Sequence, residues 1–83
     1  MTEPIFEQVR NLVSDLFGIP AREIRESSSP QSIDAWDSTQ HLNLVLALEG
    51  KFQLELLPEE IDGMKSVGDV VRIVETKLQA ANR

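Results

Sequence analysis

Few side chains in this sequence could take a direct part in chemistry. The 83-residue chain has no Cys and a single His, His41. No Ser–His–acid set, metal-ligand cluster or glycine-rich phosphate loop accompanies it, so the usual equipment of a nucleophilic or metal-dependent enzyme is missing. We therefore predict that the chain is not an enzyme and holds no metal ion. We expect His41 to pack near Trp36 rather than act as a base.

Ser38 is the hydroxyl residue that is best placed for modification. Asp37 before it is a favourable N-cap, and Gln40 three residues later completes a capping-box pattern. As the first residue of a helix predicted over residues 38–52, Ser38 should expose its hydroxyl. Taken alone, an ordinary helix-start serine is the simpler interpretation. Trp36 is interpreted as an anchor packed against the helices, the alternative being part of a partner surface.

The spacing of apolar residues predicts the elements that position Ser38. A first helix is predicted over residues 4–17, with Thr2 as its N-cap and Gly18 as a left-handed C-cap. Residues 19–36 show neither a helical nor a strand period, so they predict a loop of about 18 residues. The residues expected to fix this loop to the core are Ile19, Ile24 and Ile33.

Two more helices are predicted after the one that begins at Ser38. Pro58 suits the first position of a short helix. Ser66 can cap a last helix over residues 67–79, and we expect residues 80–83 to fray. With no strand indicated, the fold class is all-α. We expect one domain over residues 1–83, a four-helix bundle of three longer helices and one short helix, with a long loop between the first two.

The predicted helix over residues 38–52 carries two apolar stripes, since a helix advances about 100° per residue. The residues expected to face the core are Leu44, Val45, Leu48 and Phe52. Leu42 and Leu46 fall near Thr39 on the other side. We interpret this second stripe as an exposed contact surface for a partner. The alternative is a central helix that is buried all round.

Charge and hydropathy exclude several classes of function. A net charge of −6 and a pI of about 4.6 argue against nucleic-acid binding and against docking on anionic membranes. The start of the chain lacks the pattern of a signal peptide, and its apolar runs are too short to span a bilayer. Cytoplasmic residence and a monomeric state are the default expectations.

Between Asp37 and Asp62 the chain has six acidic residues and one basic residue, Lys51. Such a segment would steer a basic partner toward the start of the second predicted helix. A solvated face without a partner is the simpler alternative.

A longer pattern follows Asp37-Ser38 in register. Its parts are Ala47-Leu48-Glu49-Gly50-Lys51-Phe52, Pro58-Glu59-Glu60-Ile61 and Ser66-Val67-Gly68-Asp69. Over essentially the whole chain, this pattern resembles the acyl carrier protein family. The resemblance implies that Ser38 is the attachment residue for 4′-phosphopantetheine, which a phosphopantetheinyl transferase would install from coenzyme A with magnesium. The arm ends in a thiol, so a chain without Cys could carry an acyl thioester.

The resemblance also implies partners: the transferase, an acyl-loading ligase or transferase, and downstream acyl-processing enzymes. A phosphodiester on Ser38 would lie at the positive end of a helix dipole. By resemblance, Asp37 would also contact the transferase. The residues expected to contact partners are Asp37, Thr39, Leu42, Leu46, Glu49, Glu59 and Glu60.

Several positions depart from the family pattern. Thr39 replaces a larger aliphatic residue, and the second predicted helix has neutral Gln40 and Asn43 where acids are usual. We therefore expect a specialised carrier in a lipid or secondary-metabolite pathway. A glycine-containing approach to the serine, typical of peptidyl carriers, is absent, which disfavours but leaves open an aminoacyl cargo. The alternative function is an unmodified helical protein–protein interaction module that uses the second apolar stripe.

Overall fold

The computed structural model describes residues 4–81, and for Ala81 the backbone alone. Its elements are α1 (Ile5–Phe17), a short 3₁₀ helix η1 (Ala21–Glu23), α2 (Ser38–Phe52), α3 (Pro58–Asp62) and α4 (Val67–Ala81). No strand occurs within this described range. The predicted all-α bundle of three longer helices and one short helix is confirmed, with η1 as an addition inside the long loop.

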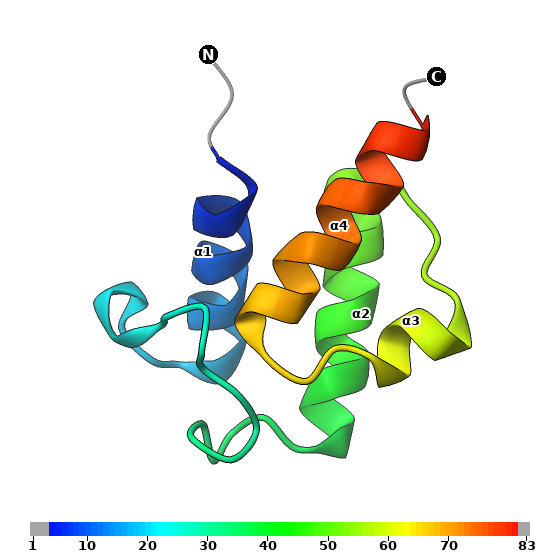
Figure 1. Cartoon of the computed structure of the whole chain (residues 1–83). Coiled ribbons are helices and arrows are strands. Elements are labelled where there is room, and N and C mark those ends of the chain that lie inside the picture. The colour runs from blue at the N-terminus through cyan, green and yellow to red at the C-terminus, as the bar shows by residue number, and fades with distance from the viewer. Residues whose placement is uncertain (1–3, 82–83) are drawn as a thin grey trace.

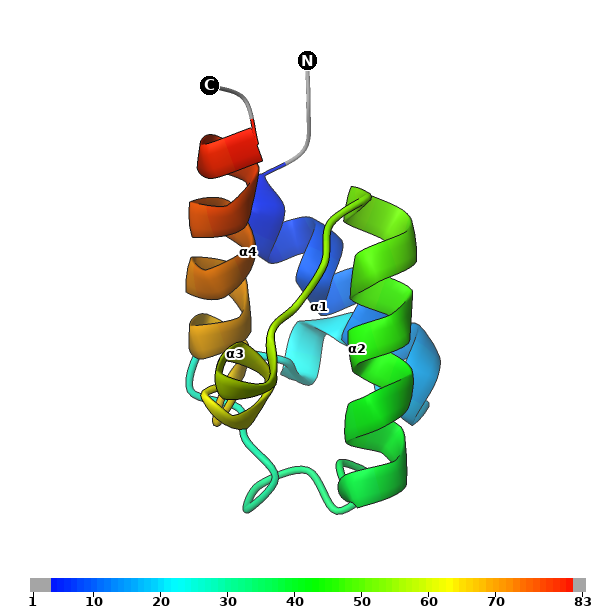
Figure 2. The same cartoon turned by 90° about the vertical axis from the view of Figure 1, so that its right-hand side faces the viewer.

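The three long helices lie side by side, with α1 running opposite to α2 and α4 (Figure 1). The short α3 lies beside the first half of α4 and faces α2 (Figure 2). An ion pair between Lys77 Nζ and Glu60 Oε1, at 3.0 Å, joins α4 to α3. The start of α2 lies at the end of the bundle opposite the start of α1 and the end of α4. Between residues 4 and 81, no helix is long and apolar enough to cross a membrane.

Aliphatic stripes from the long helices meet in one core. The fully buried side chains with the largest volumes are Leu44, Leu48, Val9, Val13, Val67, Val70 and Val74. Burial of one such side chain contributes roughly 1.5–3 kcal/mol, so this set is the main source of stability in a chain without disulfides. The loop takes part as predicted, because Ile24 and Ile33 are buried and Ile19 packs against the core while partly exposed.

Only the C-terminal end of α1 lies where the sequence predicts it. Gly18 has a φ of 69° and ends the helix in the left-handed conformation, as predicted. At the other end Pro4 has a ψ of 146° and stands before the helix, which begins at Ile5 rather than at residue 4. The predicted cap, Thr2, lies outside the described residues.

The last helix begins where the sequence places it and ends later. The Asp69 backbone N–H donates to Ser66 Oγ at 3.2 Å, which confirms Ser66 as the cap. Helix α4 continues to Ala81, so the expected fraying from residue 80 was wrong for the two alanines. Alanine has the highest helix propensity of all residues, which explains the extension. Residues 82–83 lie outside the described range.

The long loop is attached to the start of α4 by two backbone hydrogen bonds. Val67 N–H donates to the Ser28 carbonyl, and Gly68 N–H donates to the Glu26 carbonyl, each at 2.8 Å. A Cβ on Gly68 would lie 3.2 Å from that same Glu26 oxygen, so glycine permits the close approach. These bonds pair two of the first N–H groups of α4, which have no partners within the helix.

Candidate functional site

The start of α2 is fixed by a side-chain cap. Asp37 Oδ1 accepts a hydrogen bond from the Gln40 backbone N–H at 2.9 Å, as predicted. A capping box would also have the Gln40 side chain accept from the Asp37 backbone N–H, and this part of the prediction was wrong. The Gln40 amide instead donates to the Leu16 carbonyl at 3.2 Å and accepts from Asn43. The last carbonyls of α1 lack partners within that helix, and Gln40 satisfies one of them.

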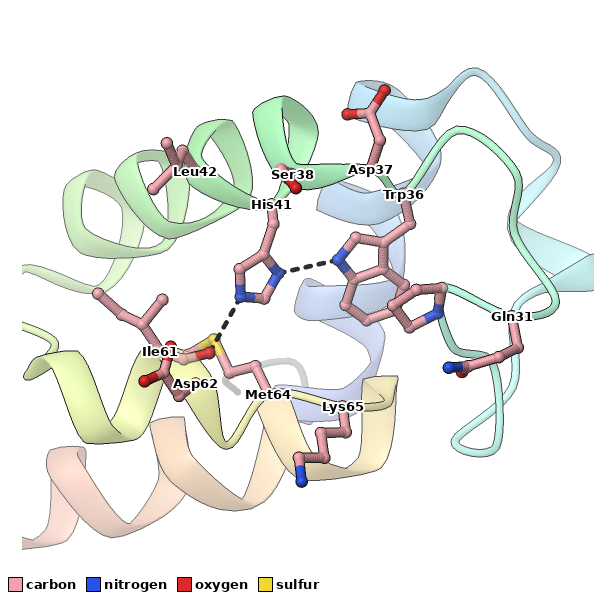
Figure 3. A pocket seen from close by; sticks show the side chains of 11 residues that line it. Gln31, Trp36, Asp37, Ser38, His41, Leu42, Ile61, Asp62, Met64 and Lys65 are labelled. Atoms are coloured by element: carbon pink, nitrogen blue, oxygen red, sulfur yellow. Dashed lines mark hydrogen bonds between the residues drawn. The ribbon is translucent and has the colours of Figure 1, made fainter.

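Ser38 is exposed as the first residue of α2 and lies at the rim of a groove of about 910 Å³. Figure 3 shows Ser38 and Leu42 along one side of this groove, with Ile61 and Met64 on the other side. Its volume is in the range of small-molecule sites. The remaining lining residues are Pro30, Gln31, Trp36, Asp37, His41, Asp62 and Lys65.

Trp36 is a structural anchor. Its side chain is only 3% exposed, and its ring centroid lies 5.6 Å from that of Phe17. Its indole Nε1–H donates to His41 Nδ1 at 2.9 Å. The anchor interpretation is confirmed, as is the prediction that His41 packs near Trp36, and a Trp36 side chain on an open partner surface is excluded.

The His41 ring is engaged at both nitrogens. Its Nε2 lies 3.0 Å from the Ile61 carbonyl oxygen, so the ring also joins α2 to α3. A ring held in this way has no nitrogen left to take the proton of Ser38. Among residues 4–81 there is no group of three or more potential metal ligands.

The second apolar stripe of α2 is exposed. Leu42 is 59% exposed and Leu46 is 65% exposed, whereas Leu44 and Leu48 on the opposite face are fully buried. The alternative of a helix buried all round is wrong. Leu57, at 49%, is a further exposed large apolar residue that the sequence analysis missed. It follows Leu56 directly in an extended segment, where neighbouring side chains point to opposite sides and only one can face the core.

Two of the acids expected to contact partners make bonds within the protein. Glu49 Oε2 accepts from the Leu56 backbone N–H at 2.9 Å, and Glu60 Oε1 accepts from the Leu57 backbone N–H at 2.8 Å. The Leu57 hydrogen bond lowers the pKa of Glu60; partial burial acts against this, and Lys77 lowers the pKa further. Both carboxylates thus hold the connection between α2 and α3.

The other expected contact residues remain available on the surface. Asp37, Thr39 and Glu59 are exposed. Together with Leu42 and Leu46, they form an exposed surface that contains both apolar and acidic side chains.

Comparison with known proteins places this architecture in a class. No family model matches the sequence. The fold is that of a small helical carrier: a solution structure of a holo acyl carrier protein from Geobacter metallireducens superposes with a TM-score of 0.85 at 28% identity. The alignment covers 96% of this chain and 92% of that one.

The sequence comparison identifies the family. An acyl carrier protein of Clostridium acetobutylicum is 40% identical over 72 residues, which is 86% of this chain and 92% of that protein. The chain belongs to the acyl carrier protein family. Proteins of this family are carriers rather than enzymes and interact with enzymes of acyl metabolism, so the prediction of a non-enzymatic carrier is confirmed.

Proposed function

We propose that this protein carries an acyl group as a thioester on a 4′-phosphopantetheine arm attached to Ser38, and presents it to the enzymes of a specialised pathway. The observation that carries the proposal is the position of Ser38, exposed as the first residue of α2 at the rim of the groove. Family membership supports the same residue, because the similarity to an acyl carrier protein covers 86% of this chain and so includes the region of Ser38.

The residues around Ser38 fit such an arm. The first N–H groups of α2 have no partners within the helix and carry its positive dipole, so they favour a phosphodiester on this side chain. The groove beside Ser38 offers apolar walls with Leu42 and Ile61, and polar groups with Gln31 and Lys65. When bound, the arm supplies the thiol that this chain without Cys lacks.

Attachment requires a separate transferase. The Ser38 oxygen forms a bond to the phosphorus of the phosphopantetheine half of coenzyme A. The bond between that phosphorus and the bridging oxygen of the diphosphate breaks, and adenosine 3′,5′-bisphosphate leaves. The hydroxyl proton passes to a base on the transferase, since both His41 nitrogens are already engaged. Asp37 holds the helix start in place and offers its charge to the transferase.

The surface proposed to meet partners combines Thr39, Leu42 and Leu46 on α2 with Asp37 and Glu59. Its centre is apolar, since Leu42 and Leu46 are more than half exposed. Glu49 and Glu60 contribute indirectly, by holding the segment between α2 and α3. This balance supports dedicated partners rather than enzymes that select for a strongly acidic helix.

Intact-mass measurement tests the proposal. The purified protein is incubated with coenzyme A, magnesium and a broad-specificity phosphopantetheinyl transferase. We expect one phosphopantetheine adduct on the wild type and on the control Ser27→Ala, whose serine is exposed in the loop, and none on Ser38→Ala. The absence of an adduct on the wild type, or its persistence in Ser38→Ala, would overturn the proposal.

A further inference from the structure

A chain of two hydrogen bonds crosses the groove beside Ser38. The Trp36 indole donates to His41 Nδ1 at 2.9 Å, and His41 Nε2 faces the Ile61 carbonyl at 3.0 Å (Figure 3). An indole N–H can only donate and a carbonyl oxygen can only accept. Nδ1 must therefore be the acceptor and Nε2 the donor. This Trp36–His41–Ile61 bridge joins the long loop, α2 and α3.

The bridge lies against the wall that separates the groove from the core. Trp36 and Met64 both line the groove, yet each is only 3% exposed and belongs to the buried core. Behind the Trp36 ring lies Phe17. Any path from Ser38 into the core between α2 and α3 must therefore pass the bridge and displace at least one of these side chains.

Opening that path breaks one or both hydrogen bonds of the bridge, and this opposes the entry of an alkyl chain. Separating α3 from His41 leaves the Ile61 carbonyl without its partner, and moving the ring leaves the Trp36 N–H without its acceptor. The loss of a hydrogen bond between partly buried groups lowers the stability of the folded state. The tail of an alkyl chain has no group to replace either hydrogen bond.

We infer that the Trp36–His41–Ile61 bridge is a specificity-determining closure that keeps the carried acyl chain in the open groove and out of the core. The inference rests on the proposed attachment of the arm at Ser38. The groove has polar lining from Gln31, Asp62 and Lys65. The closure therefore favours short or polar acyl groups over long alkyl chains. His41 is a positioning residue, since it acts through Trp36 and α3.

The test compares acyl forms of one variant at a time. Acetyl- and octanoyl-phosphopantetheine are transferred to the wild type from their coenzyme A thioesters, and loading is verified by intact mass. We expect the two wild-type forms to melt within about 1 °C of each other, because the octanoyl chain stays in the groove. In His41→Ala the octanoyl form should melt about 4 °C above the acetyl form, because the chain then enters the core of the folded state.

Two other variants make the result specific. Trp36→Phe deletes the indole donor while keeping an aromatic ring next to Phe17. Its octanoyl form should also melt at a higher temperature than its acetyl form. Asn43→Ala changes an exposed residue of the same helix outside the groove lining, and should behave as the wild type.

The outcomes that overturn the closure differ from those that overturn the proposed function. If the wild-type octanoyl form is already stabilised by several degrees, the closure is absent. If His41→Ala and Trp36→Phe lower the melting temperature of both acyl forms equally, the bridge is only structural and the inference fails. A missing adduct, seen by mass before any melting, would refute the attachment at Ser38 itself.

Discussion

The two faces of α2 both carry leucines but differ in burial. Leu44 and Leu48 are fully buried, whereas Leu42 and Leu46 are more than half exposed. The difference comes from what surrounds the helix: α1 packs on one face, whereas among residues 4–81 no helix buries the outer leucines. Apolar character alone therefore does not identify a core residue in a small bundle. The second face is the one next to Ser38.

Leu48→Ala should have the largest effect, on the core face. Removing a fully buried leucine side chain loses its burial and leaves a cavity, so the free energy of unfolding should fall by about 3 kcal/mol. Urea denaturation followed by circular dichroism measures this change. Leu46→Ala is the matched control on the other face and should change stability by less than about 0.5 kcal/mol. Equal decreases in the free energy of unfolding for both variants would contradict the distinction between the two faces.

Leu46→Asp probes the exposed face. Transfer of an acyl group to or from a partner enzyme should lose about tenfold in kcat/KM, because a charge replaces an apolar contact at the interface. The melting temperature should stay nearly unchanged, since the side chain is 65% exposed. A marked loss of stability with normal transfer would show that this residue belongs to the core after all.

Asp37→Ala, at the N-cap of α2, should have a smaller effect on stability. Losing the hydrogen bond to the Gln40 N–H should lower the free energy of unfolding by about 1 kcal/mol. Asp37→Asn keeps the cap without the charge, so its stability should match the wild type. Its rate of modification by the transferase then tests recognition of the charge separately. If Asn destabilises as much as Ala, the cap is not the source of the effect.

Glu60→Gln should have the smallest effect, at the segment that follows α2. At pH 7 we expect a loss of stability of about 0.5–1 kcal/mol, because the carboxylate accepts from the Leu57 N–H and pairs with Lys77. The pKa of Glu60 is lowered in the folded state, so its contribution is present above the ordinary pKa of a glutamate and disappears as pH falls through the lowered value. The wild type and Glu60→Gln should therefore converge in stability on acidification below about pH 4. A difference that stays constant from pH 7 to pH 3 would contradict this.

Local features could be predicted from the sequence, and contacts between distant segments could not. Gly18, Asp37 and Ser66 act on residues a few positions away, so their types and spacing were sufficient. The exposed stripe followed from helical geometry together with the small number of helices.

The sequence did not predict the contacts that side chains make with residues far along the chain. Gln40 bonds to Leu16 on another helix instead of completing the capping box. Glu60 pairs with Lys77, and His41 reaches the Ile61 carbonyl. Each of these partners becomes a neighbour only after the helices have packed, so no pattern along the chain indicates the pairing. The closure of the groove belongs to this class of contact.

The attachment of the long loop to α4 has a consequence for the order of folding. The two bonds that hold the loop join Glu26 and Ser28 to Gly68 and Val67, which lie far along the chain. Such long-range contacts form only after the intervening segment has been brought back. The loop that precedes Ser38 therefore gains these two bonds only when α4 docks. An enzyme that recognises the folded setting of Ser38 would act on chains whose last helix is already in place.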